Sequence, residues 1–245
     1  MAYISARDLG KTYGKKSSAF TALKNVKLDI EQGESVAIIG KSGSGKSTLM
    51  HLLALLDHPT SGSVKIGKKD ASELRKWEIN DLRNEKFGFV FQQFFMNPRD
   101  TVLANVMLPL KIAGLDRRER RQRAMDALAT VDLVDKAKSK ARDLSGGQKQ
   151  RVCIARALVN NPEVIFADEP TGNLDSQTGK MIENLLLDLN KHKGITLIVV
   201  THDSDLARRC KRRVHIKDGE IVDYVGRGKK AARTRAKNEA KEDKK

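Results

Sequence analysis

Short apolar runs alternate with helix-like stretches along most of the chain, which predicts a domain of the α/β class. Two segments alternate loosely between apolar and polar positions, as half-buried strands do, at residues 3–9 and 22–30, with a turn at 11–14 between them. Further strands are expected at 34–39, 63–66, 87–91, 164–167, 195–200, 213–217 and 220–225. Helices are expected at 49–56, 72–86, 176–192 and 204–210. Asp218-Gly219 predicts a two-residue hairpin turn before the last strand.

Helical patterns replace this alternation from residue 101 to about residue 161, and the Arg-rich stretch 116–123 is expected to begin a solvated helix. A helical block that interrupts a sheet domain predicts an inserted subdomain. We place it at about 93–160, within a domain that covers residues 1–225. In the segment 72–86, Trp77 is most simply interpreted as an anchor in the core.

The stretch Gly40–Thr48 fits the pattern of a phosphate-binding loop, and it lies between a predicted strand and a predicted helix, as that motif requires. Its glycines allow successive backbone N–H groups to surround a phosphate, and the helix adds its positive dipole end. Lys46 can reach the β- and γ-phosphates, and the Ser47 hydroxyl can hold Mg²⁺. A simple Gly/Ser-rich turn is the alternative, which the flanking strand and helix disfavour. The motif therefore predicts binding of a nucleoside triphosphate.

Polar residues of the kind that hydrolysis requires follow two other predicted strands. Phosphoryl transfer needs one acid near Mg²⁺ and one for the attacking water, and Asp168 and Glu169 after strand 164–167 suit these two roles. His202 follows strand 195–200. It is ordinarily a polar group at a strand end, although its position also fits a γ-phosphate contact.

The segment Leu144–Gln148 is expected to be a polar loop that opens a helix over Lys149–Asn160. A helix N-terminus of this kind can bind an anion. For the pentapeptide alone, a simple helix cap at Ser145 is an acceptable alternative. Its place between the phosphate loop and the Asp168-Glu169 pair favours the anion-binding interpretation.

With 245 residues the chain is long enough for one large α/β domain with an insertion. Its formal charge of +16 would attract nucleic acid or an anionic membrane equally. Residues 226–245 hold nine Lys or Arg against three acids and few apolar residues, so we expect a disordered basic tail, with solvation and membrane or RNA contact as open alternatives. No apolar run reaches the ~18 residues of a membrane span, and the first residues resemble no secretory signal. Cys153 and Cys210 are expected to be buried or idle thiols.

Taken in order, several motifs resemble the set that characterises ABC ATPases: Gly40–Thr48, Gln92, Leu144–Gln148, Asp168-Glu169, Leu174-Asp175 and His202. The resemblance covers about residues 1–225. It implies a P-loop NTPase of the ABC ATPase type, with a mixed sheet core, an antiparallel β subdomain and an inserted α-helical subdomain. In that family two ATPase domains pair head to tail, and each ATP lies between the phosphate loop of one and the LSGGQ loop of the other.

The resemblance also implies a role for each motif residue. Tyr13 would stack on the adenine, and ATP would be held by Gly40, Lys41, Ser42, Gly43, Ser44, Gly45, Lys46, Ser47 and Thr48. Mg²⁺ would be held by Ser47, Gln92 and Asp168, and the catalytic set would be Glu169, His202, Gln92 and Lys46. Glu169 would polarise the water, and His202 would steady the γ-phosphate. The facing subunit would add its own Ser145, Gly146, Gly147, Gln148 and Asp175.

At a finer level, residues 41–50, 56–62 and 167–175 are similar to the MacB-like, LolD-like and cell-division group of ABC ATPases. The stretch Phe94–Asp100 departs from the FNLLPxLT-like run that is usual there, so the identity of the permease and of the substrate stays open. The resemblance implies a homodimeric, cytoplasmic ATPase subunit on the inner face of the membrane. It would drive a separate permease in export, lipoprotein release or mechanotransmission, with docking near Phe94, Phe95 and Met96.

The alternative is a soluble ABC ATPase that acts on nucleic acid or ribosomes, and only the positive charge supports it. Translation factors of this type carry two ATPase domains, and repair or chromosome proteins carry coiled coils or zinc modules. The present chain shows one domain, no heptads and no cysteine clusters. Nucleic acid is therefore not the expected partner, and the LSGGQ loop separates the chain from P-loop kinases.

Overall fold

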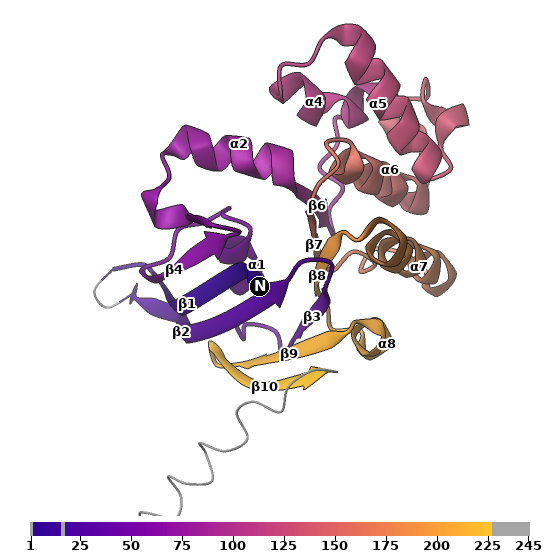
Figure 1. Cartoon of the computed structure of the whole chain (residues 1–245). Helices are drawn as coiled ribbons and strands as arrows, with labels where there is room; N and C mark the ends of the chain where they lie inside the picture. The colour runs from indigo at the N-terminus through magenta and orange to yellow at the C-terminus, as the bar shows by residue number, and fades with distance from the viewer. Residues whose placement is uncertain (1, 16–17, 227–245) are drawn as a thin grey trace, which may run out of the picture.

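The structure, a computed structural model, describes residues 2–15 and 18–226 (Figure 1). A four-stranded antiparallel sheet has the order β2-β1-β4-β5. Its strands are β1 (Ala2–Tyr13), β2 (Phe20–Glu31), β4 (Ser61–Ile66) and β5 (Lys69–Asp70). Except for Gly226, the segment expected to be a disordered basic tail lies outside the described residues.

A second sheet of six strands has the order β10-β9-β3-β8-β7-β6. Its strands are β3 (Ser35–Ile39), β6 (Phe87–Phe91), β7 (Val164–Asp168), β8 (Thr196–Val200), β9 (Arg212–Lys217) and β10 (Glu220–Gly226). All neighbours in this sheet pair in parallel except β9 and β10. The mixed sheet and the separate antiparallel sheet confirm the predicted fold class.

Helices α1 (Lys46–Leu53) and α2 (Lys76–Lys86) precede β6, and α7 (Ser176–Lys193) and α8 (Ser204–Arg209) flank β8 in the chain. Between β6 and β7 the chain forms α3 (Val102–Val106), α4 (Leu108–Ile112), α5 (Arg117–Thr130) and α6 (Gly146–Leu158). Figure 1 shows α4, α5 and α6 grouped to one side of the sheets. Short 3₁₀ turns lie at Ala71–Glu73, Val134–Lys136 and Ala141–Asp143. In the described part of the chain no helix is long and apolar enough to cross a bilayer.

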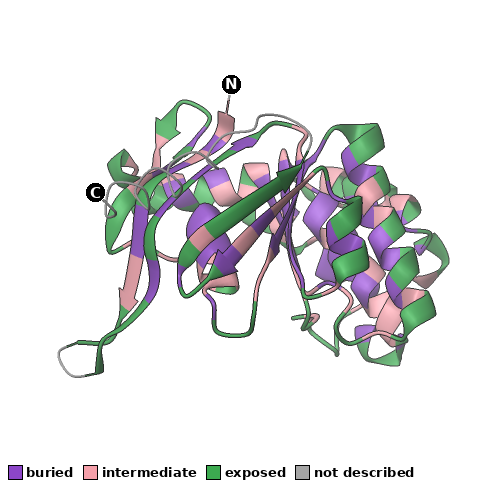
Figure 2. Ribbon diagram, turned by 90° about the horizontal axis from the view of Figure 1, so that it is seen from below, coloured by how far each residue is buried: buried purple, intermediate pink, exposed green. Residues whose placement is uncertain are grey.

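The central strands β3, β7 and β8 of the six-stranded sheet are buried on both faces, whereas β10 at its edge is largely exposed (Figure 2). Because side chains alternate along a strand, Ile165 and Ala167 of β7 belong to a cluster with residues of α5, α6 and α7. Phe166, between them, belongs to a second cluster with α1 and the antiparallel sheet. Burial on both faces explains why the central parallel strands appear in the sequence as continuous apolar runs.

The predicted hairpin turn supports the phosphate loop from behind. Asp218 and Gly219 both have positive φ, 52° and 83°, as a two-residue turn between twisted strands requires. The Gly219 N–H donates to the carbonyl of Ser44 at 3.1 Å. A Cβ on Gly219 would lie 2.8 Å from the carbonyl oxygen of Ala22, so a larger residue would disturb this contact.

Three expectations from the sequence were wrong in detail. Trp77 is 59% exposed and not a core anchor, because α2 buries Ile79 and Leu82 and the opposite side of the helix carries Trp77. Lys11, Thr12 and Tyr13 belong to β1 and not to a turn. Helix α6 begins at Gly146, three residues before the expected Lys149, because Ser145 caps it.

Candidate nucleotide-binding site

Four loops meet at one edge of the six-stranded sheet, where the neighbouring parallel strands β3, β8, β7 and β6 end. Ile38 lies beside Val200, Val200 beside Asp168, and Asp168 beside Phe91 in the strand register. The phosphate loop, His202, the Asp168-Glu169 pair and Gln92 follow these positions in the chain. Ligands of parallel α/β sheets bind at this carboxyl edge. The sheet thus brings together four of the predicted motifs.

The phosphate loop is a strained turn closed by its own lysine. Gly43 and Gly45 have φ of 76° and 102°, and a Cβ on Gly45 would lie 2.6 Å from the carbonyl oxygen of Ala22. The Lys46 ammonium donates across the loop to the carbonyl of Lys41 at 3.0 Å. The Ser44 hydroxyl is buried and finds no hydrogen-bond partner among the described residues. Backbone curvature, one free hydroxyl and a helix beginning at Lys46 form a set of donors that suits a polyphosphate.

Ser47 and Asp168 supply oxygen atoms next to this loop. The Ser47 hydroxyl lies 3.5 Å from Oδ1 of Asp168. Burial raises the pKa of Asp168 above its ordinary value, although His51, the Ser47 hydrogen bond and Lys46 oppose the shift. Among the described residues no group of three or more His, Cys, Asp or Glu side chains could hold a metal ion. A hydroxyl, a carboxylate and the nearby Gln92 amide are instead the hard oxygen donors that Mg²⁺ accepts beside phosphates.

Glu169 is held in an unusual backbone conformation that directs it toward His202. Its φ is 46°, and its N–H donates to the carbonyl of Val200 at 2.9 Å. Oε2 of Glu169 lies 2.8 Å from Nδ1 of His202. Left-handed backbone in a residue other than glycine is uncommon and is often found at functional sites. The pair places a carboxylate and an imidazole side by side at the edge of the site.

Gln92 is bound to a residue that sequence reasoning missed. Asn173 donates from Nδ2 to the backbone carbonyl of Gln92 at 2.9 Å, and the Gln92 amide donates to Oδ1 of Asn173 at 3.2 Å. Gly172 allows this approach, because a Cβ there would lie 2.9 Å from Nε2 of Gln92. The position of Asn173 between Glu169 and Asp175 was its only sequence signal.

Tyr13 is oriented by Asp57, a second residue that sequence reasoning missed. The Tyr13 hydroxyl donates to Asp57 at 3.1 Å, and Lys11 donates to the same carboxylate at 2.7 Å. The Lys11 ammonium also lies 4.9 Å from the centre of the Tyr13 ring. Burial alone would raise the pKa of Asp57, but hydrogen bonds from Lys11, the His58 N–H and Tyr13 lower it overall. The carboxylate therefore stays ionised and fixes the ring.

Ser145 to Gln148 form a separate element at the start of α6. The Ser145 hydroxyl accepts from the N–H of Gln148 at 3.3 Å, and the Gln148 side chain accepts from the N–H of Ser145 at 3.0 Å. This capping box satisfies two donors at the helix N-terminus. Asp175 caps α7 in a similar way by accepting from Thr178 at 2.9 Å, and that interaction lowers its pKa. Among the described residues no hydrogen bond joins 145–148 to 40–48.

Comparison with known proteins leads to the class of protein that the sequence motifs resemble. The profile of the family described as ABC transporter matches residues 23–172. The lipoprotein-releasing system ATP-binding protein LolD of Syntrophus aciditrophicus is 48% identical over 89% of this chain and 98% of that protein. The macrolide export ATP-binding/permease protein MacB of Mannheimia succiniciproducens is 47% identical over 91% of this chain, which corresponds to 34% of that longer protein.

Solved structures agree with the sequence relatives. The dimeric structure of MJ0796, a bacterial ABC transporter cassette, has a TM-score of 0.84 and 46% identity, covering 92% of this chain and all of that chain. A second dimeric structure of MJ0796, a post-hydrolysis state bound to ADP and Pi, has a TM-score of 0.84 and 45% identity at the same coverage.

The phosphate loop, the paired carboxylates and the sheet define a nucleotide-hydrolysing P-loop domain. Within that class, the chain belongs to the ABC transporter family and is an ATP-binding, ATP-hydrolysing subunit of this type. These findings confirm the resemblance seen in the sequence. They favour the transporter subunit over a soluble ATPase that acts on nucleic acid.

Proposed function

We propose that two copies of this chain bind two ATP molecules head to tail and drive a separate integral membrane permease from the inner face of the membrane. The dimer follows from the division of the site. Lys46, Ser47 and Glu169 lie at one edge of the sheet, whereas Ser145 and its capping box lie at the start of α6. A second copy can bring its own Ser145, Gly146, Gly147, Gln148 and Asp175 to the first copy's phosphate loop.

Within each half-site we assign roles from the contacts described above. Residues 40–48 surround the phosphates, and the side chain of Tyr13 stacks on the adenine. Ser47, Asp168 and Gln92 would hold Mg²⁺, which would offset the charge of the phosphates. Glu169 accepts the proton of the attacking water, and His202 steadies Glu169 and the γ-phosphate.

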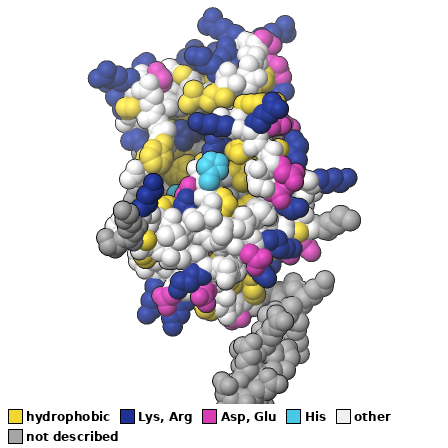
Figure 3. Space-filling model, turned by 90° about the vertical axis from the view of Figure 1, so that its left-hand side faces the viewer, with side chains coloured by type: hydrophobic (Ala, Val, Ile, Leu, Met, Phe, Trp, Pro, Cys, Tyr) yellow, Lys and Arg dark blue, Asp and Glu magenta, His cyan; other side chains and the backbone are white. Residues whose placement is uncertain are grey.

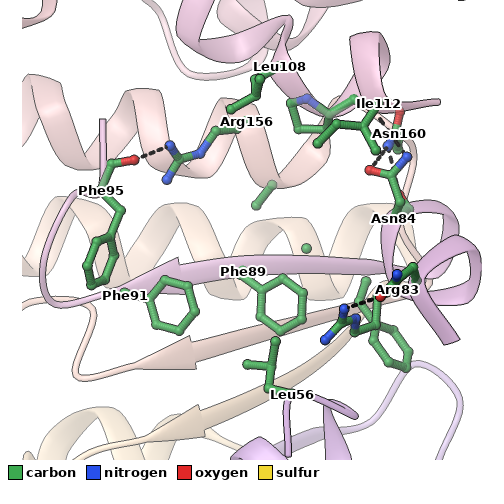
Figure 4. Close-up of a pocket in the computed structure, with 15 residues that line it drawn as sticks. Leu56, Arg83, Asn84, Phe89, Phe91, Phe95, Leu108, Ile112, Arg156 and Asn160 are labelled. Carbon is green, nitrogen blue, oxygen red and sulfur yellow. Dashed lines mark hydrogen bonds between the residues drawn. The ribbon is translucent and has the colours of Figure 1, made fainter. Parts of the chain in front are cut away.

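An apolar groove of about 540 Å³ is the single observation that supports a membrane partner (Figure 4). Its floor is the aromatic row Phe87, Phe89 and Phe91 of β6, and its walls come from α2, α4 and α6. Three of its apolar side chains are largely exposed: Phe95 at 65%, Leu108 at 51% and Ile112 at 69%. Exposed apolar patches of this kind mark interaction sites.

The groove is connected to the catalytic edge through Gln92. Phe95 follows Gln92 by three residues, and its ring packs edge-on against Phe91 with centroids 5.5 Å apart. Arg156 of α6 donates to the carbonyls of Phe95 at 2.7 Å and Phe94 at 3.0 Å. Of the three predicted docking residues, Phe95 is exposed, whereas Phe94 and Met96 are half-buried. We therefore place the docked segment of the permease against Phe95 and Leu108.

Phe95→Asp tests this docking site. The φ of Phe95 is 42°, a conformation that Asp adopts more readily than Phe, so the variant is expected to fold and to keep its basal ATPase activity. Co-purification with the membrane partner from detergent extracts should be lost. Val134→Asp is the matched control, because Val134 is also exposed, at 45%, but does not line the groove. Retained co-purification of Phe95→Asp, or equal loss with the control, would contradict the docking site.

A further inference from the structure

The beginning of α5 carries positive charge that the helix itself does not neutralise. Arg117, Arg118, Arg120 and Arg121 lie in its first two turns, where cations oppose the helix dipole and repel one another at i,i+3 and i,i+4 spacing. Asp116 caps the helix, and Glu119 pairs with Arg123. Within the described residues the four arginines make no ion pair. A merely solvated helix face would alternate in sign, so this cluster indicates an external anionic partner.

The arginine cluster follows in the chain directly after the helix that forms one wall of the groove. Helix α4 ends at Ile112 and α5 begins at Arg117, and α4 forms one wall of the groove. Lys111 and Ile112 at the end of α4 are both exposed. Figure 3 shows Lys and Arg side chains gathered over the α4 and α5 region, above a hollow in which hydrophobic side chains are visible. The charge therefore borders an apolar opening.

The opposite wall of the groove ends in an exposed tryptophan. Trp77 is 59% exposed and shares with Asn80 and Asn84 the face of α2 that lines the groove, by its i, i+3, i+7 spacing. Lys76 beside it is also exposed. Both rims of the groove thus combine a basic residue with a large exposed apolar one. Tryptophan together with Lys and Arg is the side-chain mixture that membrane–water interfaces favour.

We propose that the basic rim, defined as Lys76, Trp77, Lys111, Ile112, Arg117, Arg118 and Arg121, rests on the anionic lipid headgroups that surround the docked permease. Only the orientation of the rim toward a bilayer rests on the proposed function. An exposed isoleucine and an exposed tryptophan are more stable at the boundary between headgroups and acyl chains than in water. Phosphates of nucleic acid would use the arginines but would leave Ile112 uncovered, so the membrane is the favoured partner.

Trp77 makes the proposal directly measurable, because it is the only tryptophan in the chain. The full chain is mixed with vesicles of phosphatidylcholine alone or with a quarter phosphatidylglycerol. Sedimentation measures binding, and tryptophan emission reports whether Trp77 enters the headgroup layer. We expect binding and a shift of the emission to shorter wavelength with the anionic vesicles only, both fading as salt rises. Binding without any emission change would overturn the proposal, because it would place another basic segment on the lipid.

Arg117→Glu combined with Arg118→Glu is the decisive variant. Each basic residue near an anionic surface contributes about fivefold to partitioning, so reversal of both should weaken vesicle binding at least about tenfold. The same change replaces cations by anions at a helix N-terminus and should preserve or raise the melting temperature. Loss of binding therefore cannot be attributed to unfolding.

Lys191→Glu combined with Lys193→Glu is the matched control, with the same change in net charge at the exposed end of α7. Vesicle binding of this control should fall much less. Equal losses in the two double variants would overturn the proposal, as would an emission shift with single-stranded RNA but not with vesicles. Because no permease is present, a negative result would leave the docking test with Phe95→Asp unaffected.

Discussion

At the scale of single residues, Asp168 combines a cost in stability with a role in the site. Burial raises its pKa above the ordinary value of 3.8. A carboxyl group with a raised pKa in the folded state destabilises the fold when it is ionised. The penalty is absent below the ordinary pKa, grows as the pH rises from the ordinary to the folded pKa, and is complete above the folded pKa. A bound cation would offset it.

We predict that Asp168→Asn raises the melting temperature of the nucleotide-free chain at pH 7 and abolishes Mg²⁺-dependent hydrolysis. In a chain of this size each kcal/mol gained in the free energy of unfolding raises the melting temperature by about 2–4 °C. Differential scanning fluorimetry with and without MgATP, together with a steady-state ATPase assay, measures both effects. The stabilisation should vanish at pH values below the ordinary pKa of Asp168. A variant that melts at a lower temperature at pH 7 would show that the carboxylate stabilises the fold.

The sequence alone points to single residues where a motif fixes them locally. Lys46 and Ser47 follow from the phosphate loop, and Glu169 follows from its place at the end of an apolar strand. Asn173 and Asp57 could not be predicted, because their partners Gln92 and Tyr13 lie 81 and 44 positions away in the chain. Such pairings depend on tertiary structure and leave no periodic signal in the sequence.

At the scale of elements, α6 links the Ser145 cap to the groove. Donors along one stripe of this helix bind backbone carbonyls of other segments: Gln150 binds Phe91 and Pro170, Cys153 and Arg156 bind Phe94, and Arg156 also binds Phe95. Just beyond the end of α6, Asn160 binds the carbonyl of Asn84. The sequence allowed a helix cap at Ser145 as an alternative, and the structure has that cap, so α6 begins before the expected Lys149. Trp77 was misplaced because weak periodicity in α2 left its buried face ambiguous.

Ser145 caps α6 and, in the proposed dimer, also contacts the γ-phosphate of the other copy, and substitution can separate these two roles. Ser145→Ala removes the cap and should destabilise the chain by about 1 kcal/mol. Ser145→Asp keeps a good cap but brings a negative charge toward the γ-phosphate bound by the other subunit. We predict that Ser145→Asp retains the melting temperature of the unmodified chain while losing ATPase activity as completely as Ser145→Ala. Full activity in Ser145→Asp would mean that the residue serves α6 alone.

At the scale of the whole molecule, the fold class followed from the sequence because the alternation of strands and helices is strong. The separation of the two half-sites could not be derived from patterns within one chain. Residues 40–48 and 145–148 belong to different elements, and the described chain holds no hydrogen bond between them. In the proposed dimer each ATP would contact both copies, so hydrolysis would weaken the contact between them.

Glu169→Gln should trap that assembly. The amide cannot accept a proton, so hydrolysis should slow by at least about a hundredfold while MgATP still binds. Size-exclusion chromatography with ATP should then show a dimer, which should return to a monomer without nucleotide. Adding Ser145→Arg places a bulky side chain at the shared phosphate and should restore the monomer even with ATP. Met181→Arg, at an exposed position on α7, provides a control for the added charge and is expected to remain dimeric. A dimer that survives Ser145→Arg would place the subunit contact elsewhere and leave each ATP within a single chain.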